Sequence, residues 1–204
     1  MHFFNDIVTQ LEQQLGMLWL PLLACSLVAL GIIVEKTVVL LYQQFKRKAV
    51  PSSAPAFGEK KLPALMRDGL TLLTLHREED KSLREEIAAI WLLNQRTHMS
   101  SGIRMLQAIA LLTPLLGLLG TVLGLIRVFD GLAKHQGPIE PALLADGLGL
   151  AMYTTAAGLM IALPALAAAH FFQIWIDKMI RRAEHTMNQA NLLILGIELE
   201  PNHD

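Results

Sequence analysis

Three threonines are the side chains of this sequence best suited to chemistry in an apolar setting. Thr121 lies within one apolar stretch, and Thr154 and Thr155 lie within a second one further along the chain. A threonine hydroxyl donates and accepts hydrogen bonds but does not titrate near neutral pH. The three hydroxyls can therefore line a proton path without carrying the proton. Alternatively, each hydroxyl bonds a carbonyl of its own helix, which is common in membrane helices.

Small residues recur at helical spacing around these threonines. Each glycine costs a water-soluble helix about 1 kcal/mol relative to alanine, whereas in a membrane small residues let two helices approach closely. The first stretch carries Gly117, Gly120 and Gly124. The second carries a stripe of small residues and a mid-helix proline that its neighbours must accommodate: Ala151, Thr155, Gly158, Ala162, Ala165 and Ala169, with Pro164. We predict that the two stretches form an antiparallel pair of packed helices.

Composition indicates a helical membrane protein. The 204 residues are 53% hydrophobic and 17% charged, with a mean hydropathy of +0.43, and the apolar residues gather in three runs. A net charge of -1 argues against a nucleic-acid binder. The single cysteine, Cys25, cannot form an internal disulfide. Neither an enzyme motif nor a spacing of metal ligands is present, so we expect no catalysis, cofactor or metal.

The distribution of positive charge predicts the orientation. Eleven of the 17 Lys and Arg residues lie in 43–104, and three more follow the last apolar run, whereas 130–146 holds only Lys134. The positive-inside rule places 43–104 and the C-terminus in the cytoplasm. The predicted segments begin with a periplasmic amphipathic segment (1–16), the first span with its cytoplasmic extension (17–42), a cytoplasmic region (43–106) and the second span (107–128). They continue with a periplasmic loop (129–146), the third span (147–172), and a cytoplasmic C-terminal helix and tail (173–204).

Two further helices are expected outside the spans. The mixed apolar pattern of 80–107 predicts one long helix that runs on into the second span. A separate final helix is expected over 177–195, after the third span has ended. The fold class is thus all-α, with three spanning helices and long cytoplasmic helical extensions, N-out and C-in. Because three helices enclose no pore alone, an oligomer with a partner helix is expected.

Two motifs carry a resemblance to a known family. The sequences G-L-L-G-T-V-L-G-L-I-R-V-F at 117–129 and Y-T-T-A-A-G-L-M-I-A-L-P-A at 153–165 resemble the MotA/TolQ/ExbB proton-channel subunits, most closely ExbB and TolQ. The resemblance implies a pentamer in the bacterial inner membrane around a central pore lined by spans two and three. It also implies an ExbD-like single-span partner whose aspartate carries the proton, and a TonB-like protein that proton flow energises.

The resemblance assigns roles to particular residues. Thr121 takes the place of the threonine in the family's G-T-V, and Thr155 that of the threonine before A-x-G-L, so both are expected to face the partner's aspartate. The family's glutamate five residues before the second threonine is replaced here by Leu150. One hypothesis is that Asp146, one turn away, supplies that negative charge at the outer mouth of the pore. The alternative is that Asp146 is the N-cap of the third span.

Three functional readings remain open from the residues. An ExbB-like subunit would energise uptake across the outer membrane, and a TolQ-like subunit would serve envelope maintenance. A non-conducting membrane scaffold, whose small residues only pack helices, belongs to a different class. An intramembrane aspartate in a co-expressed single-span partner would distinguish the first two readings from the third.

The charge asymmetry generates a testable topology. In a Cys25→Ser background, a cysteine introduced by Lys60→Cys should resist a membrane-impermeant thiol reagent in intact cells and react after permeabilisation. A cysteine introduced by Lys134→Cys should react in intact cells. The predicted orientation would be wrong if the position 60 cysteine were labelled without permeabilisation.

Overall fold

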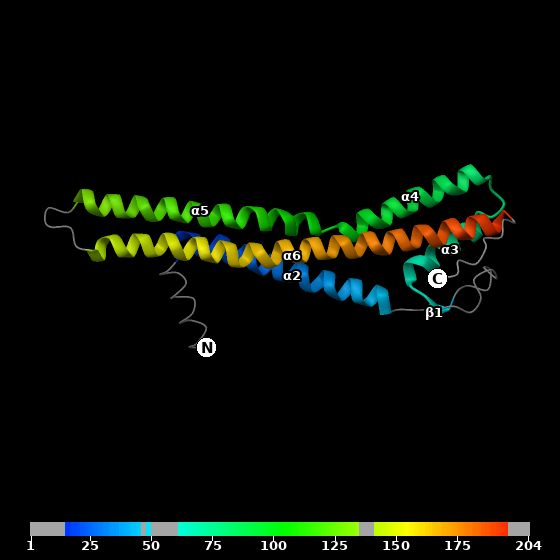
Figure 1. The fold of residues 1–204 in the computed structure, drawn as a ribbon, viewed down its shortest axis with the longest axis horizontal. Coiled ribbons are helices and arrows are strands. Elements are labelled where there is room, and N and C mark those ends of the chain that lie inside the picture. The colour runs from blue at the N-terminus through cyan, green and yellow to red at the C-terminus, as the bar shows by residue number, and fades with distance from the viewer. Residues whose placement is uncertain (1–14, 46–47, 50–60, 135–140, 196–204) are drawn as a thin grey trace, which may run out of the picture. The chain divides into compact units, whose positions relative to one another are not determined.

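The computed structural model describes residues 15–45, 48–49, 61–134 and 141–195 (Figure 1). The chain divides into two compact units, and two of its helices contribute to both. One unit joins the chain up to Val34 with Gly102–His170, and the other joins Glu35–Ser101 with the chain from Phe171 onward. The predicted amphipathic segment 1–16 lies almost entirely outside the described residues.

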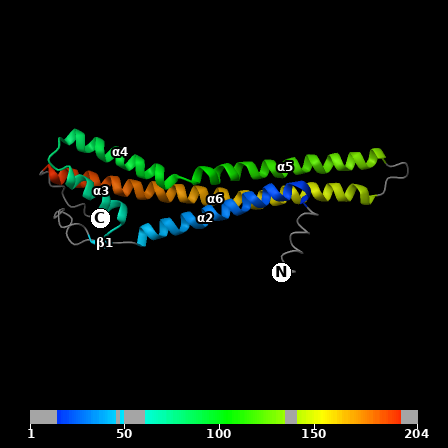
Figure 2. The same ribbon diagram turned by 180° about the vertical axis from the view of Figure 1, so that it is seen from behind.

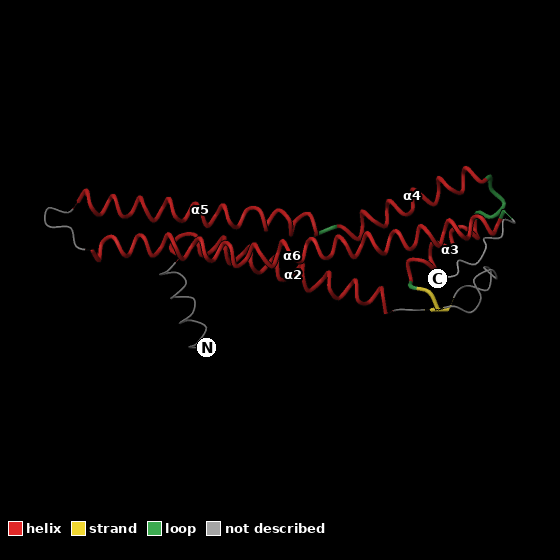
Figure 3. The backbone as a smooth tube through the Cα atoms, viewed as in Figure 1, coloured by secondary structure: helices red, strands yellow, loops and turns green. Residues whose placement is uncertain are grey.

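Helices make up nearly all of the described chain (Figure 3). In order they are η1 (Gly16–Leu18), α2 (Trp19–Phe45), α3 (Ala64–Leu75), α4 (Lys81–Ser100), α5 (Ile103–Lys134) and α6 (Pro141–Ile194). Between α2 and α3 lies a short antiparallel ribbon, in which β1 (Lys48–Ala49) pairs with β2 (Lys61–Leu62). Within the described residues, three helical stretches are long and apolar enough to cross a membrane: Gly16–Gln43, Ile103–Lys134 and Gly147–Ile194.

The predicted continuous helix over 80–107 is wrong. Helix α4 ends at Ser100, and α5 begins at Ile103. Between them Gly102 adopts a φ of 83°. This left-handed conformation is cheap for glycine and ends a helix, so the local backbone overrides the apolar periodicity.

The expectation of a separate final helix over 177–195 is also wrong. Helix α6 runs without interruption for 54 residues, from Pro141 to Ile194. Within 170–180 there is neither glycine nor proline to stop it. Lysine and arginine are good helix formers, so the change from apolar to charged composition does not end the helix.

Helices α5 and α6 form the core of the first unit as a closely packed antiparallel pair (Figures 1 and 2). A Cβ atom at Gly117 would lie 2.9 Å from the carbonyl oxygen of Thr154, and one at Gly158 would lie 2.6 Å from that of Thr113. Both distances are shorter than real Cβ contacts. The predicted small-residue packing therefore occurs within one chain, between its second and third spanning helices.

Leu15, helix η1 and the N-terminal part of α2 pack beside this pair. Leu15, Leu18 and Leu22 are buried there. They form an apolar cluster with residues from both helices of the pair: Leu116 and Leu123 of α5, and Ala157 and Ile161 of α6. One flank of the α5–α6 pair is thus covered by η1 and α2.

The second unit has its own apolar core among α3, α4 and the C-terminal part of α6. Leu70 and Leu73 of α3 pack with Ala88 of α4 and Met187 of α6. A buried arginine joins the same elements: Arg84 donates from Nε to Oδ1 of Asn191 at 3.0 Å and from Nη1 to the Arg77 carbonyl oxygen at 2.8 Å. This guanidinium ties the α3–α4 turn to the end of α6.

The backbone contact at Gly158 can be tested against a glycine on the same helix. We expect Gly158→Leu to cost on the order of 3 kcal/mol, because the side chain must enter the space occupied by Thr113 and Gly117. Gly149→Leu is the control, since nothing lies within 4 Å of a Cβ atom there. Thermal unfolding and the yield of monodisperse detergent-extracted protein measure the difference. Equal behaviour of the two variants would contradict the close packing.

Candidate functional site in the α5–α6 hairpin

Thr154 lies inside the contact between α5 and α6. Its side chain is fully buried and fills the space above Gly120. Its hydroxyl lies 3.0 Å from both the Leu150 and the Ala151 carbonyl oxygens of its own helix. Of the two consecutive threonines, Thr154 therefore occupies the buried stripe that the sequence pattern assigned to Thr155. Its position favours a packing role.

Thr155 lies at the edge of the same contact. Its hydroxyl is partly buried and lies 3.2 Å from the Ala151 carbonyl oxygen of its own helix. It also lies 3.3 Å from the Gly117 carbonyl oxygen of α5. Among the hairpin threonines, this is the one whose hydroxyl lies within hydrogen-bonding distance of a carbonyl oxygen on the facing helix.

Thr121 is half-buried on α5. Its hydroxyl donates to the Leu118 carbonyl oxygen at 2.7 Å. Sequence reasoning overlooked a fourth hydroxyl, that of Thr113, which is fully buried and donates to the Ile109 carbonyl oxygen at 2.9 Å. Thr113 precedes Gly117 by four residues, so it lies on the same helical stripe as the glycines, and that spacing is the signal for its burial.

The helix register places Thr121 and Thr155 on the flank of the hairpin that α2 does not cover. At about 100° per residue, Thr121 lies about 160° around α5 from Leu123, which packs against the α2 cluster. Thr155 lies about 160° around α6 from Ala157, which packs against the same cluster. Because the two helices face each other, both threonines lie on the side of the hairpin opposite α2.

The apolar parts of the hairpin contain no carboxylate. Neither 103–129 nor 147–170 includes an Asp or Glu. Threonine hydroxyls can pass hydrogen bonds along a path but do not titrate near neutral pH. These two stretches therefore supply no carboxylate that could exchange a proton beside the threonines. Among the described residues, no group of three or more His, Cys, Asp or Glu side chains could hold a metal ion.

The predicted alternative role of Asp146 as a helix N-cap is wrong. Helix α6 begins at Pro141, so the backbone of Asp146 already lies in the second helical turn. The position is one turn from Leu150, which is buried beside Gly16, and about 180° around the helix from Thr155. The structure describes the backbone of Asp146 and not its side chain.

The small residues expected to pack the helices occupy the α5–α6 contact. Six of these small residues are buried: Gly117, Gly120 and Gly124 on α5, and Ala151, Gly158 and Ala162 on α6. A Cβ atom at Gly124 would lie 2.6 Å from the Gly147 carbonyl oxygen, so the close approach extends along the hairpin. Pro164 is exposed within α6, and the helix continues through it.

Comparison with known proteins covers this whole hairpin. The model of the MotA/TolQ/ExbB proton channel family matches residues 59–185. The biopolymer transport protein exbB1 of Vibrio cholerae serotype O1 is 44% identical over 209 residues, covering 95% of this chain and 91% of the relative. ExbB of Pseudomonas putida is 40% identical over 75 residues, 37% of this chain and 22% of the relative. ExbB of Xanthomonas campestris pv. campestris is 33% identical over 103 residues, 48% of this chain and 38% of the relative.

The matched region includes all four hairpin threonines and the glycines that pack against them. The similarity to the Vibrio cholerae protein also extends over the rest of the chain, well beyond the two motifs. With three helices able to span a membrane, the chain is a multi-pass membrane protein. It belongs to the MotA/TolQ/ExbB proton channel family.

Proposed function

We propose that the chain is a proton-channel subunit of an energy-transducing complex in the bacterial inner membrane, with the N-terminus outside and the C-terminus in the cytoplasm. The observation that carries this proposal is the shared position of Thr121 and Thr155 on the flank opposite α2. On that flank the two hydroxyls face whatever lies beside the hairpin. In this position they can hydrogen-bond a proton carrier during its protonation and deprotonation.

The proton carrier in this proposal is an aspartate on an ExbD-like single-span partner. The apolar parts of α5 and α6 contain no carboxylate of their own, so the titrating group comes from outside the chain. One hairpin presents a single uncovered flank and cannot surround a helix. Several copies, five in the proposal, would place their Thr121–Thr155 flanks around the partner helices. Proton flow would then move the partner relative to the ring and energise a TonB-like protein for transport across the outer membrane.

The contacts within the hairpin divide the four threonines into two pairs. Thr113 and Thr154 are fully buried between the helices and bond their own backbone, which supports the packing role that a structural scaffold would need. Thr121 and Thr155 are only partly buried and remain accessible from the flank. The proposed proton path therefore uses the second pair, and a TolQ-like complex serving envelope maintenance would use it in the same way.

Threonine-to-valine variants test this division, because valine keeps the shape and removes the hydroxyl. We expect Thr155→Val to lower proton-dependent transport about tenfold, since a lost hydrogen bond to a charged group weakens binding by roughly 1.5–3 kcal/mol. Thr121→Val should have a similar but smaller effect. Growth on a substrate that requires a TonB-dependent receptor, with the partner co-expressed, measures the loss.

Thr154→Val is the matched control, as it makes the same chemical change at the adjacent residue. It should leave transport near the parental level, because its hydroxyl is satisfied within α6. Assembly of each variant is checked by native mass spectrometry. Full transport by the Thr121→Val/Thr155→Val double variant would show that these hydroxyls have no part in the proton path. It would favour the non-conducting scaffold, in which all four threonines only pack the helices.

Asp146 supplies, in this proposal, a negative charge at the outer end of the hairpin, where it would raise the local proton concentration. Asp146→Asn should then reduce transport a few-fold at high external pH and have little effect at low external pH, where protons are abundant. Asp130→Asn, an equal change of charge near the end of α5, is the control. If Asp146→Asn keeps parental transport across the whole external pH range, the charge has no part in the proton path.

A further inference from the structure

A cavity of about 400 Å³ lies between α3 and the stretch of α6 that follows its most apolar part. Its lining is mainly apolar at one end, with Leu65 of α3 and Phe171, Ile174 and Trp175 of α6. At the other end it includes the two cations Lys178 and Arg182. All of these residues belong to the second compact unit.

A second hollow of about 330 Å³ continues the cationic end. It shares Met66, Lys178 and Arg182 with the first hollow and adds Arg181 and His185 of α6. The two hollows thus form one groove that changes from apolar to cationic along α6. From Phe171 to Arg182 the helix rises about 16 Å, which exceeds the thickness of a single headgroup layer. The groove is therefore long enough to contact both a headgroup and part of a hydrocarbon chain.

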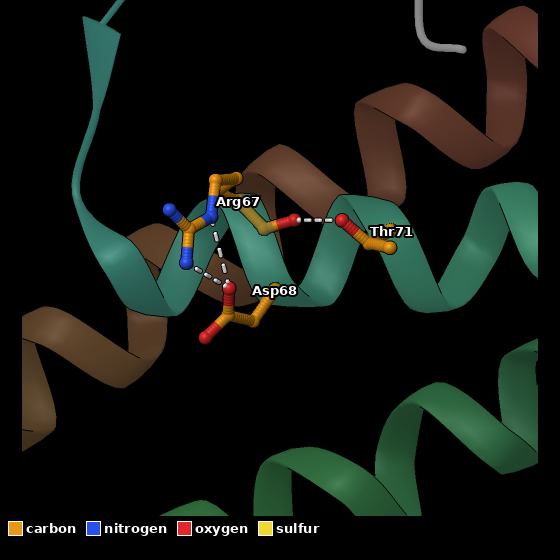
Figure 4. Close-up of polar contacts among 3 residues, drawn as sticks. All are labelled: Arg67, Asp68 and Thr71. Atoms are coloured by element: carbon orange, nitrogen blue, oxygen red, sulfur yellow. Dashed lines mark hydrogen bonds and ion pairs between the residues drawn. The ribbon is translucent and has the colours of Figure 1, made fainter. Parts of the chain in front are cut away.

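The cations of the groove have no acidic partner in the described part of the chain. The ion pairs formed there join Arg67 to Asp68, Lys81 to Glu85 and Arg96 to Asp177. The pair nearest in sequence to the groove lining on α3 is shown in Figure 4, where Asp68 neutralises Arg67 at 2.7 Å. Lys178, Arg181 and Arg182 therefore leave a local positive charge that an anion would complement.

The apolar end of the groove is open to the surroundings of the chain. Phe171 is 59% exposed and Ile174 is 66% exposed. The rings of Phe171 and Trp175 pack edge to face with centroids 5.5 Å apart, so they present one aromatic surface. These residues directly follow the apolar run that ends near Ala169, which is where aromatic side chains gather at a membrane–water interface.

We propose that this groove binds one anionic phospholipid, with its phosphate held by Lys178 and Arg182 and the upper part of an acyl chain lying on Ile174 and Trp175. The charge complementarity accounts for the phosphate, and the apolar lining favours a phosphate that carries a hydrocarbon chain over a free one. The bound lipid would brace α3 against α6. This inference needs α6 to cross a membrane and is independent of proton flow.

Native mass spectrometry of the full-length protein tests the proposal with defined lipids. The protein is extracted and exchanged into detergent containing equal amounts of phosphatidylglycerol and phosphatidylethanolamine. The parent should retain phosphatidylglycerol preferentially, and Lys178→Gln/Arg182→Gln should weaken that retention about tenfold or more, because each cation near an anionic lipid contributes to binding. Water-soluble glycerol phosphate at the same concentration should not bind.

The double variant Arg77→Gln/Lys81→Gln is the matched control. It removes the same charge from exposed positions of the same unit outside the groove and should retain phosphatidylglycerol like the parent. Ile174→Asn tests the apolar end without introducing a new buried group, and should weaken retention of both lipids. Because Lys178 and Arg182 are unchanged in this variant, any loss of lipid measures the contribution of the apolar end alone.

Three results would overturn the proposal. The first is equal retention of phosphatidylglycerol by the parent and the Lys178→Gln/Arg182→Gln variant. The second is binding of glycerol phosphate as tightly as the lipid, which would make the groove a simple anion site. The third is a change in the number of chains per complex in the groove variants with unchanged lipid retention, which would make the groove a contact between copies. The outcome of the transport assays on the threonine variants has no bearing on these lipid-binding results.

Discussion

The close approach of the α5 and α6 backbones is the constraint on which the first unit depends. A Cβ atom at Gly117, Gly124 or Gly158 would meet a backbone carbonyl oxygen of the facing helix within 3 Å. In an apolar solvent, association of helices relies on such contacts more than on the burial of large side chains. This explains why the motifs are rich in glycine and alanine although glycine weakens an isolated helix. The large apolar side chains are then left to face outward.

The same contact determines what each polar side chain can do. Because the glycines hold the two helices in one register, Thr154 is enclosed over Gly120, and Thr155 lies at the rim within reach of the Gly117 carbonyl oxygen. The α2 helix covers one flank, so the half-buried Thr121 and Thr155 share the other. Packing and proposed function are thus consequences of one geometry. A side chain larger than hydrogen at the glycines would change both.

Much of this arrangement could be predicted from the sequence because apolar runs and small-residue spacing are strong signals. The three spanning stretches and the α5–α6 pairing follow from them. The spacing predicts Thr155 in the buried stripe, but Thr154 occupies that position. Over so few turns, two consecutive threonines fit a helical period of 3.5 or 3.6 residues almost equally well, so the spacing cannot distinguish them. The break between α4 and α5 depends on the backbone angle φ of Gly102, which the spacing of apolar residues does not reveal. The continuity of α6 through Lys178 cannot be predicted from hydropathy, because the change from apolar to charged residues marks the membrane surface and not the end of the helix.

Cysteine accessibility measures whether Thr121 and Thr155 point away from α2. In a Cys25→Ser background, cysteine is introduced singly at positions 121, 154 and 155 of the complex assembled in membranes with its partner. We expect a small water-soluble thiol reagent to modify the cysteines at 121 and 155, the partner to slow both reactions, and the cysteine at 154 to stay unmodified. Equal modification at 154 and 155, or protection at 121 and 155 that does not depend on the partner, would contradict this orientation.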